Sequence, residues 1–374
     1  MKIWLLQDQL RSGGTERQTL LLARAFLDAG HAATVVTFRP GGTLAPALGS
    51  IPRRVLQPFD TGLNGFAPGL LRAARTAAPD VILCMGRMAN CHAGRLARAL
   101  PATTVVGTMR TGKPLPFLFR RSLRTVAHVV ANSTESAGIL THTYAVPPDR
   151  VSVIHNALVF PPSPAVSLAP APAPRDQTVR ARFGATPDTA VLLCVGMLRP
   201  EKNQRALIEI AATLGPAHPW QLWLAGEGSA RADCEATASR LGVADRVKFL
   251  GFQSDPTPLY HAADVAVLAS KAESLSNFLI EAQAHGLPAV AYAAGGVAEC
   301  LLPDVTGTVI APGDADGFRA ALDNYLASPE RRAVAGEAAR RFAREAFDPA
   351  RQARAYLDLF TRLRPTHAEK TVTY

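Results

Sequence analysis

The sequence is short of aromatic residues, of paired cysteines and of long apolar runs, and each shortage argues against a class of protein. Aromatic residues make up only 6% of the chain, which is few for the stacked side chains that bind single-stranded nucleic acid. The five cysteines are an odd number without Cys-x-x-Cys spacing, so we expect free, buried thiols in a reducing cytoplasm rather than disulfides or a zinc site. No apolar run approaches the roughly 18 residues of a transmembrane helix. The N-terminal segment 1–8 is too short and too soon acidic for a signal peptide, and we expect it to form a first strand.

Acidic residues are scarce in the first half of the chain only. Residues 1–160 hold 18 Lys and Arg against 7 Asp and Glu, a net charge of +11, whereas the remainder holds 22 against 23, a net charge of −1. This asymmetry predicts an acidic partner for the first half. Nucleic acid is one candidate, but an anionic membrane surface or a phosphorylated lipid acceptor fits the few aromatic residues better.

Length and composition indicate a globular protein of two domains, since 374 residues with 48% hydrophobic and 19% charged residues are long for one core. Strand-like apolar runs alternate with helix-period segments, which predicts doubly wound α/β sheets. The first series of expected strands covers residues 3–6, 33–38, 80–83, 103–107 and 126–131. The second covers 191–195, 220–224, 247–249, 265–268, 289–292 and 308–310. Helices are expected over 15–29, 315–327, 330–346 and 348–363.

A stretch rich in Pro and Ala, residues 158–178, separates the two series and is typical of a linker. We therefore expect an N-terminal domain over residues 1–165, a linker over 166–185 and a C-terminal domain over 186–346. Residues 347–374 are expected to form a last helix, which packs back on the first domain, and a tail.

The segment 272–288 carries two carboxylates, Glu273 on a short polar stretch and Glu281 inside an apolar helical pattern that Gly286 and Pro288 end. A loop that enters a helix presents free backbone N–H groups, which favour an anion such as diphosphate. Glu273 would lie just before that anion, and Glu281, about two turns into the helix, could reach a ribose. These features together suit a sugar nucleotide, and the alternative is a pair of solvated surface charges.

The same block resembles the Glu-x7-Glu signature of retaining glycosyltransferases with the GT-B fold, especially the GT4 family. Further motifs are similar to that family in the same order: Gly13-Gly14-Thr-Glu16, the segment 192–203, Gly226-Glu-Gly228, the segment 247–251 and the segment 293–307. The resemblance covers nearly the whole chain, densely over 190–315 and loosely over 40–130. It implies two Rossmann-like domains facing across a cleft, with the acceptor in the first and the nucleotide sugar in the second.

The implied reaction moves a sugar from a nucleotide-diphosphate sugar, with a UDP-sugar favoured, to a glycan or lipid-linked acceptor, with retention of the anomeric configuration. Such a step belongs to the biosynthesis of cell-surface polysaccharide or glycolipid. A sugar-nucleotide epimerase on the same scaffold and a non-catalytic module that binds sugar nucleotides are the alternatives.

The resemblance also implies roles for single residues. Glu273 would contact the sugar hydroxyls, Glu281 both ribose hydroxyls, and Arg199 and Lys202 the diphosphate. Further donor contacts are expected from Gly14, Gly251, Leu275, Ser276 and Asn277, and acceptor contacts from Gly13, Arg110 and Asn132, where Asn132-Ser133 would also cap the next helix. We expect no metal ion, because the sequence has no clustered acidic signature of the Asp-x-Asp kind and cations can stabilise the leaving diphosphate.

The chain departs from the family pattern at two positions. Met197 stands where many relatives have an arginine, so Arg199 is expected to take over the phosphate contact. Arg110 stands about where many relatives have a histidine, and an arginine cannot act as a general base at neutral pH, although it could hold a phosphate or a sugar hydroxyl. The nearby His92 and His128 are expected to be structural.

Two further patterns have simpler explanations beside the functional one. Gly226-x-Gly228 lacks the third glycine of a dinucleotide fingerprint, so an NAD enzyme is disfavoured. Over residues 110–124, basic and apolar side chains are mixed, as is typical of the interface of an anionic membrane. They are Arg110, Lys113, Leu115, Phe117, Leu118, Phe119, Arg120, Arg121 and Arg124. This predicts a protein at the inner face of a membrane, and a core-packing loop with a solvated basic rim is the alternative.

Overall fold

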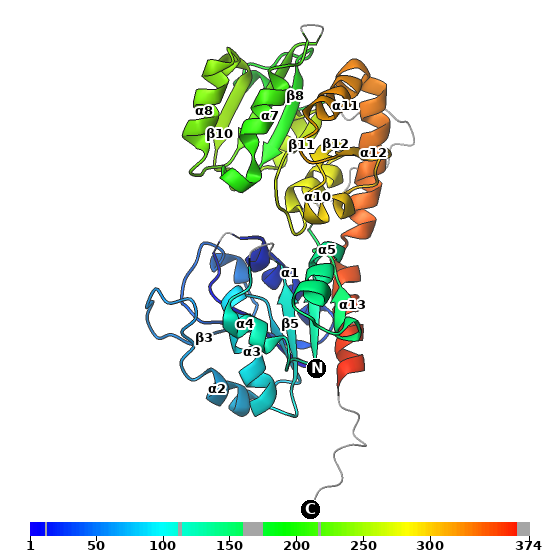
Figure 1. Cartoon of the computed structure of the whole chain (residues 1–374). Helices are drawn as coiled ribbons and strands as arrows, with labels where there is room; N and C mark the ends of the chain where they lie inside the picture. Colours follow the sequence, from blue (N-terminus) through cyan, green and yellow to red (C-terminus); the bar gives the residue numbers. More distant parts are fainter. Residues whose placement is uncertain (12, 111–113, 160–174, 216–217, 365–374) are drawn as a thin grey trace, which may run out of the picture. The chain divides into compact units, whose positions relative to one another are not determined.

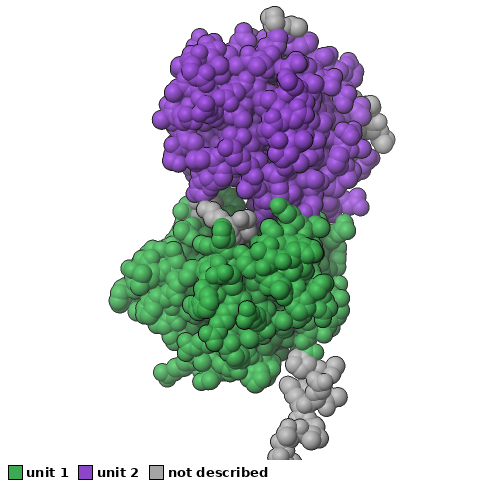
Figure 2. Space-filling model, in the orientation of Figure 1, with its two compact units in different colours: residues 1–159, 347–374 green, residues 160–346 purple. Residues whose placement is uncertain are grey.

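Two parallel β-sheets, each in its own compact unit, organise the chain. The computed structural model describes residues 1–11, 13–110, 114–159, 175–215 and 218–364. The chain divides into unit 1, Met1–Val159 with Phe347–Tyr374, and unit 2, Phe160–Ala346 (Figure 2).

Unit 1 is built on a parallel sheet in the order β3-β2-β1-β4-β5-β6-β7; Figure 1 labels β3 and β5 among these strands. Its strands are β1 (Lys2–Gln7), β2 (Ala32–Thr37), β3 (Arg53–Val55), β4 (Val81–Cys84), β5 (Thr104–Met109), β6 (His128–Ala131) and β7 (Val151–Val153). Its helices are α1 (Gly14–Asp28), α2 (Leu70–Ala77), α3 (Arg87–Ala99), α4 (Phe117–Ser122), α5 (Thr134–Gly138) and α13 (Pro349–Leu363), with short turns η1 (Pro46–Leu48), η2 (Ile139–Thr143) and η3 (Pro148–Arg150). Helices cover both faces, because Trp4 and Leu6 pack in one apolar core and Ile3 and Leu5 in another.

The last helix, α13, belongs to unit 1 although it follows unit 2 in the sequence. Tyr356 and Phe360 of α13 pack against Phe26 of α1, with ring centroids 6.4 and 5.9 Å apart. Buried polar contacts add to this apolar one. The Nε2 group of Gln352 donates to Oε1 of Gln18 in α1 at 3.0 Å and to the carbonyl of His155 at 2.6 Å.

Unit 2 is built on a second parallel sheet in the order β10-β9-β8-β11-β12-β13. Its strands are β8 (Ala190–Val195), β9 (Trp220–Ala225), β10 (Val247–Gly251), β11 (Val265–Leu268), β12 (Ala289–Tyr292) and β13 (Gly307–Ile310). Its helices are α6 (Gln177–Arg182), α7 (Gln204–Ala211), α8 (Arg231–Arg240), α9 (Thr257–Ala262), α10 (Asn277–Ala284), α11 (Ala315–Ala327) and α12 (Pro329–Ala346), with short turns η4 (Pro200–Lys202), η5 (Ala244–Arg246) and η6 (Gly295–Cys300).

A buried ion pair fastens α6 to the centre of this second sheet. Arg180, which is 1% exposed, donates from Nη1 to the carbonyl of Ala262 at 2.7 Å and to Oδ2 of Asp264 at 3.0 Å. The same Asp264 oxygen accepts the N–H of Val191 at 2.8 Å. Each charge is therefore compensated by close partners, as a buried charge requires, and the starts of β8 and β11 are fixed beside each other.

The prediction of two doubly wound α/β sheets is confirmed. Every expected strand forms to within two residues at each end. The strands β3 and β7 were not predicted; each is three residues long and partly exposed, so neither has the continuous apolar run that marks a buried parallel strand. Residues 166–174 of the expected linker lie outside the described residues, and within the remainder α6 forms, with the Asp176 side chain capping it.

All five cysteines lie within the described ranges and are free thiols, four of them buried and Cys91 half-buried. Among the helices in the described part of the chain, none combines the length and the apolar composition that crossing a membrane requires.

Candidate functional site

The loops that follow β8 and β11 lie side by side in unit 2. Along the chain, β9 follows β8 on one side of the sheet and β12 follows β11 on the other. The strand order therefore reverses between β8 and β11, and ligands of open α/β sheets bind at the carboxyl ends of the strands at such a point. The β8 loop carries Arg199 and Lys202, and the β11 loop carries Glu273.

The β8 loop is braced from behind by the two glycines that follow β9. Gly226 and Gly228 have φ values of +148° and +156°, and a Cβ atom on them would lie 2.0 and 2.1 Å from the carbonyl oxygens of Gly196 and Leu198. Glycine is thus required for a close approach of two backbones. The Gly226-x-Gly228 pattern is a packing device, which agrees with the expectation that it is not a dinucleotide fingerprint.

Two hydrogen bonds join the β8 loop to the β11 loop. Asn203, in the left-handed conformation with φ of +55°, donates from Nδ2 to the carbonyl of Ala269 at 3.1 Å. The N–H of Lys271 donates to the carbonyl of Glu201 at 2.9 Å. These contacts fix the spacing of the two loops without help from a ligand.

Between the joined loops, Lys202 and Glu273 form an ion pair. The Nζ of Lys202 lies 2.6 Å from Oε1 of Glu273, and the two side chains are 28% and 8% exposed. The predicted phosphate ligand and the predicted sugar ligand are therefore in direct contact. A diphosphate that approaches Lys202 has to share the ammonium group with a carboxylate that is mostly shielded from water.

Arg199 lies in the same loop with a much freer side chain. It is 41% exposed, and its Nη1 lies 4.0 Å from Oε1 of Glu201, which is a long ion pair in water. Met197 is half-exposed, and its carbonyl accepts from Nε2 of Gln204 at 3.0 Å. The guanidinium is thus exposed and only weakly paired, and the expectation that it replaces the family arginine stays a prediction.

Gly251 ends β10, two strands away from β8 in the sheet. Its φ is +68°, and its carbonyl accepts the N–H of Gly226 at 2.8 Å. This bond ties the ends of β9 and β10 together. Because glycine has no side chain, a contact of Gly251 with the donor sugar nucleotide would have to come from its backbone, and this contact stays a prediction.

The helix that carries Glu281 begins later than expected. Ser276 caps α10, because its hydroxyl accepts the N–H of Leu279 at 3.3 Å and residues 273–276 stay outside the helix. Glu281 is therefore the fifth residue of α10, about one turn from its start rather than two. The cap also takes up a backbone donor that the sequence alone would leave for an anion.

The three residues that enter α10 differ in what they can offer a ligand. Leu275 and Ser276 are buried, 7% and 4% exposed, so contacts from these two would come from the backbone, whereas Asn277 is half-buried. The N–H of Ser276 donates to Sγ of Cys300 at 3.3 Å, and this thiol donates to the carbonyl of Gly296 at 3.4 Å. Burial raises the pKa of Cys300, so the thiol stays neutral. Cys300 thus anchors the loop from behind, a role that no sequence signal indicated.

Glu281 is held by a tyrosine that the sequence analysis missed. The hydroxyl of Tyr260 in α9 donates to Oε2 of Glu281 at 2.6 Å. Tyr260 is 1% exposed, and its ring stacks on His285 with centroids 4.9 Å apart and an interplanar angle of 22°. An aromatic residue inside a short apolar helix predicts only core packing, so the contact could not be found without the fold.

In unit 1, two carboxyl groups, those of Asp8 and Glu16, lie around the glycine loop that follows β1. Gly13 is the N-cap residue of α1, and a Cβ on it would lie 2.4 Å from Oε2 of Glu16. Asp8 accepts the N–H groups of Met88 and Ala89 at 3.0 and 2.7 Å and so caps α3. Burial raises the pKa of both carboxyl groups. Gly14 is the first residue of α1, and the predicted ligand contacts of both glycines stay predictions.

Arg110 ties three segments of unit 1 together. Its Nη1 donates to Oδ1 of Asn156 at 2.5 Å and its Nη2 donates to the hydroxyl of Tyr356 in α13 at 2.7 Å. Nε is buried and has no hydrogen-bond partner among the described residues. Burial raises the pKa of Tyr356, so its phenol stays neutral and Arg110 is the only charged group of this pair. The side chain expected to hold an acceptor is therefore already engaged in a structural role.

The remaining predicted residues of unit 1 lie at strand ends. Asn132 follows β6 and is buried, and its N–H donates to the carbonyl of Met109 at 3.2 Å. Ser133, rather than Asn132, caps α5 by accepting the N–H of Ser136 at 3.1 Å. His128 contacts the Ser152 hydroxyl at 2.8 Å, which fits the structural role expected for it.

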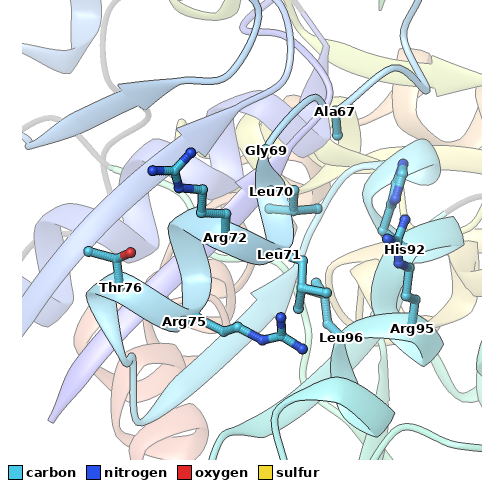
Figure 3. Close-up of a pocket in the computed structure, with 10 residues that line it drawn as sticks. All are labelled: Ala67, Gly69, Leu70, Leu71, Arg72, Arg75, Thr76, His92, Arg95 and Leu96. Atoms are coloured by element: carbon cyan, nitrogen blue, oxygen red, sulfur yellow. The ribbon is translucent and has the colours of Figure 1, made fainter.

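The other histidine lies beside a cavity of about 400 Å³ between α2 and α3 (Figure 3). Nε2 of His92 contacts the carbonyl of Gly65 at 2.9 Å, and its ring meets Phe38 edge to face. The cavity is lined by Ala67, Gly69, Leu70, Leu71, Arg72, Arg75, Thr76, His92, Arg95 and Leu96, so it contains none of the predicted site residues.

The mixed basic and apolar stretch divides into an inner and an outer part. Leu115 and Phe119 are 5% and 2% exposed and belong to the core, whereas Phe117 and Leu118 are 67% and 54% exposed. Leu115 and Phe119 therefore follow the core-packing alternative, and only Phe117 and Leu118 remain as apolar side chains that a membrane could contact. A groove of about 730 Å³ adjoins α4 and is lined by Phe117, Arg120, Arg121, Arg124, Thr143, Tyr144 and Ala145. Lys113 lies outside the described residues.

The statement that the sequence has no Asp-x-Asp pattern is wrong, since Asp314-Ala315-Asp316 has this spacing. Asp314 is the N-cap residue of α11 and accepts the N–H of Gly317 at 2.8 Å. The first of the two carboxylates is therefore occupied as a helix cap.

Comparison with known families matches both units of the chain. The model described as "Glycosyl transferases group 1" matches residues 176–342, and the model described as "Glycosyltransferase Family 4" matches residues 12–158. The chain belongs to the GT4-type glycosyltransferases. The first match covers the braced loops and α10, and the second covers the glycine loop and Arg110.

Several relatives of this glycosyltransferase are known by name. It is 34% identical over 222 residues to D-inositol 3-phosphate glycosyltransferase 2 of Catenulispora acidiphila, a match that covers 56% of this chain and 50% of that one. It is 34% identical over 148 residues to the lipopolysaccharide core biosynthesis glycosyltransferase LpsE of Rhizobium meliloti, covering 40% and 43%. The matches thus span half or less of the length of these two relatives.

Solved structures confirm the fold of the glycosyltransferase. Anabaena Alr3699/HepE in complex with UDP superimposes with a TM-score of 0.81 at 23% identity, covering 97% of this chain and all of that one. At this identity, the likeness establishes the GT-B fold and no more.

Proposed function

We propose that this glycosyltransferase transfers a sugar from a UDP-sugar to a glycan or lipid-linked acceptor, with retention of the anomeric configuration, in the biosynthesis of cell-surface polysaccharide or glycolipid. The observation that carries the proposal is the contact of Lys202 with Glu273 where the strand order reverses, with Glu281 one turn into the adjoining helix. The three groups match the three parts of a nucleotide sugar that need polar partners: Glu273 the sugar hydroxyls, Lys202 the diphosphate and Glu281 the ribose hydroxyls. The UDP complex of the Anabaena structure supports the choice of nucleotide.

The leaving diphosphate gains negative charge as the glycosidic bond breaks, and a positively charged group has to stabilise it. We assign this role to Lys202 and Arg199, together with the backbone N–H groups of the loop that enters α10. Lys202 is preorganised by Glu273, whereas Arg199 is free to close over the phosphates. Two cations of this kind make the reaction independent of a metal ion.

Retention is expected from the way in which Glu273 is held. Its carboxylate is paired with an ammonium group at 2.6 Å, which suits it to accept hydrogen bonds from the sugar hydroxyls better than to attack the anomeric carbon. The proposed route is same-face substitution. The bond from the anomeric carbon to the diphosphate oxygen breaks, the acceptor oxygen bonds to the same face, and its proton passes to the departing phosphate.

The acceptor is assigned to unit 1, near the ends of β1, β5 and β6, where Gly13, Arg110 and Asn132 lie. The first half of the sequence carries the net charge of +11, and an anionic or phosphorylated acceptor complements it. The names of the two relatives, one acting on an inositol phosphate and one in lipopolysaccharide core biosynthesis, support an acceptor of this chemistry.

We further propose that the protein acts in the cytoplasm at the inner face of a membrane, through α4 and its groove. Phe117 and Leu118 are exposed next to Arg120, Arg121 and Arg124. Apolar side chains can enter the interface while the cations bind anionic headgroups.

The decisive experiment incubates the purified protein with a UDP-sugar, with and without a glycolipid acceptor, and follows UDP release and the product by NMR. Acceptor-dependent release and a product with the donor's anomeric configuration support the proposal. Conversion of the sugar without acceptor would indicate an epimerase, and binding without any turnover would indicate a non-catalytic module. The Glu273→Gln variant serves as the control for chemistry at this site.

A further inference from the structure

The geometry points to Tyr260 as a positioning residue for the nucleotide: we propose that its hydroxyl fixes the Glu281 carboxylate so that the ribose hydroxyls are recognised. The inference rests on the proposed function, since it takes Glu281 as the ribose ligand. It assigns a role to a residue outside the sequence motifs of the site.

Tyr260 crosses one face of α10. It contacts Phe278, Glu281 and His285, which are three and four residues apart and therefore lie in one row along the helix. The Tyr260 ring is nearly parallel to the rings of Phe278 and His285, at interplanar angles of 23° and 22°. The two flanking rings fix the plane of the tyrosine, so its hydroxyl has a fixed direction.

That hydroxyl donates to Oε2 of Glu281 at 2.6 Å, the short distance typical of a hydrogen bond to a charged oxygen. Tyr260 is 1% exposed and Glu281 is half-buried, so the bond is shielded from water at the tyrosine. A short hydrogen bond to one of its oxygens restricts the rotation of the carboxylate. This matters for the ribose, because its neighbouring hydroxyls can both be accepted only when the carboxylate plane faces them.

A free glutamate side chain would have to give up rotational freedom each time a nucleotide binds. The bond from Tyr260 removes that freedom before binding, so the contact is preorganised. The effect acts only on ligands that carry ribose hydroxyls. Tyr260 should therefore govern discrimination between ribose and its deoxy forms, and not the affinity for the diphosphate.

The test measures the affinities of UDP and 2′,3′-dideoxy-UDP by calorimetry for the unmodified protein and for Tyr260→Phe. The unmodified protein should bind the dideoxy nucleotide at least about tenfold more weakly than UDP. In Tyr260→Phe this ratio should fall to about threefold or less through a loss of UDP affinity, while the affinity for the dideoxy nucleotide stays the same. A merely structural role would weaken both ligands alike and leave the ratio unchanged, and that result would overturn the inference.

Two further variants make the result specific. Tyr325→Phe removes a hydroxyl from a buried tyrosine of α11 in the same unit and should keep the unmodified ratio. Glu281→Gln, with Tyr260 intact, should lower the ratio by itself, and adding Tyr260→Phe to it should change nothing more. An additional effect of Tyr260→Phe in that background would show that it does not act through Glu281. Thermal unfolding of each variant checks that it is folded.

The unmodified protein's affinities for UDP and 2′,3′-dideoxy-UDP distinguish failure of the proposed function from failure of the role proposed for Tyr260. If the unmodified protein does not bind UDP, or binds UDP and its dideoxy form equally, the donor site itself is wrongly assigned and the role of Tyr260 falls with it. If the unmodified protein discriminates and Tyr260→Phe discriminates as well, the donor site stands and only the positioning role is overturned.

Discussion

Neutralising Glu273 should separate binding of the nucleotide from transfer of the sugar. In the structure, the Glu273 carboxylate lies 2.6 Å from the Lys202 ammonium group. Glu273→Gln keeps the size of the side chain but removes the charge that competes with diphosphate for this ammonium. It also removes the charged acceptor proposed for the sugar hydroxyls. We therefore expect the affinity for UDP to stay the same or rise, whereas kcat/KM for transfer from the UDP-sugar should fall.

The magnitudes follow from the contacts. A hydrogen bond to a charged group contributes about 1.5–3 kcal/mol, so loss of the contact with the sugar should lower kcat/KM roughly 10- to 150-fold. UDP lacks the sugar and loses no contact. Its affinity should stay within about threefold of the unmodified protein or become tighter, because Lys202 is released and a nearby negative charge is gone.

Calorimetry with UDP and a steady-state assay of UDP release measure the two quantities. Glu235→Gln is a matched control, since it neutralises an exposed glutamate that pairs with Arg231 in α8 at 2.8 Å, and it should change neither value. The reasoning is refuted if Glu273→Gln weakens UDP binding in parallel with kcat/KM, or if both stay unchanged. The first result would make the ion pair a scaffold for the loop, and the second would make Glu273 a surface charge.

Three further predictions concern the ribose, the metal and the membrane. Glu281→Ala should weaken UDP binding by roughly 1–3 kcal/mol in a calorimetric titration, the scale of lost hydrogen bonds to a charged group; no measurable change would remove Glu281 from the site. Activity should survive an excess of chelator, because cationic side chains stabilise the leaving diphosphate, and a loss restored by manganese or magnesium would contradict that assignment. The protein should co-sediment with anionic vesicles at low salt and be released as salt rises, since surface cations are screened. Replacing Arg120, Arg121 and Arg124 with Ser should weaken this binding by about 1 kcal/mol per cation while UDP affinity stays intact, and absence of vesicle binding at low salt in the unmodified protein would instead favour an acceptor free in solution.

The sheets were predictable because their strands are buried on both faces and therefore read as continuous apolar runs. The strand β4, Val81–Cys84, is buried at every position and was found from its sequence. In contrast, β3 (Arg53–Val55) has exposed side chains at two of its three positions, and it pairs with β2 through its backbone and through polar contacts of Arg53 with Thr37 rather than through apolar side chains. Pairing of this kind leaves no apolar run in the sequence.

The site was predictable in its residues but not in its geometry. The Lys202–Glu273 contact depends on β8 and β11 being neighbours, although the two residues are 71 positions apart. The motif spacing placed Glu281 two turns into its helix, and the structure places it one turn in, because Ser276 captures the first turn as a cap. A serine such as Ser276 can serve either as the cap or as a residue inside the helix. Which of the two occurs depends on tertiary contacts such as the bond from the N–H of Ser276 to Sγ of Cys300.

Arg110 shows most clearly what a local reading of the sequence leaves out. It was singled out as a departure from the family histidine, which suggested a changed role toward the acceptor. In the structure its guanidinium holds Tyr356, which lies 246 positions away on the helix that returns to unit 1. The arginine and the returning helix therefore form one feature: a histidine at this position would leave the buried Tyr356 hydroxyl without this donor. The departure is explained first by how α13 is fastened, and whatever Arg110 contributes to acceptor binding has to come from a side chain already held in place by that contact.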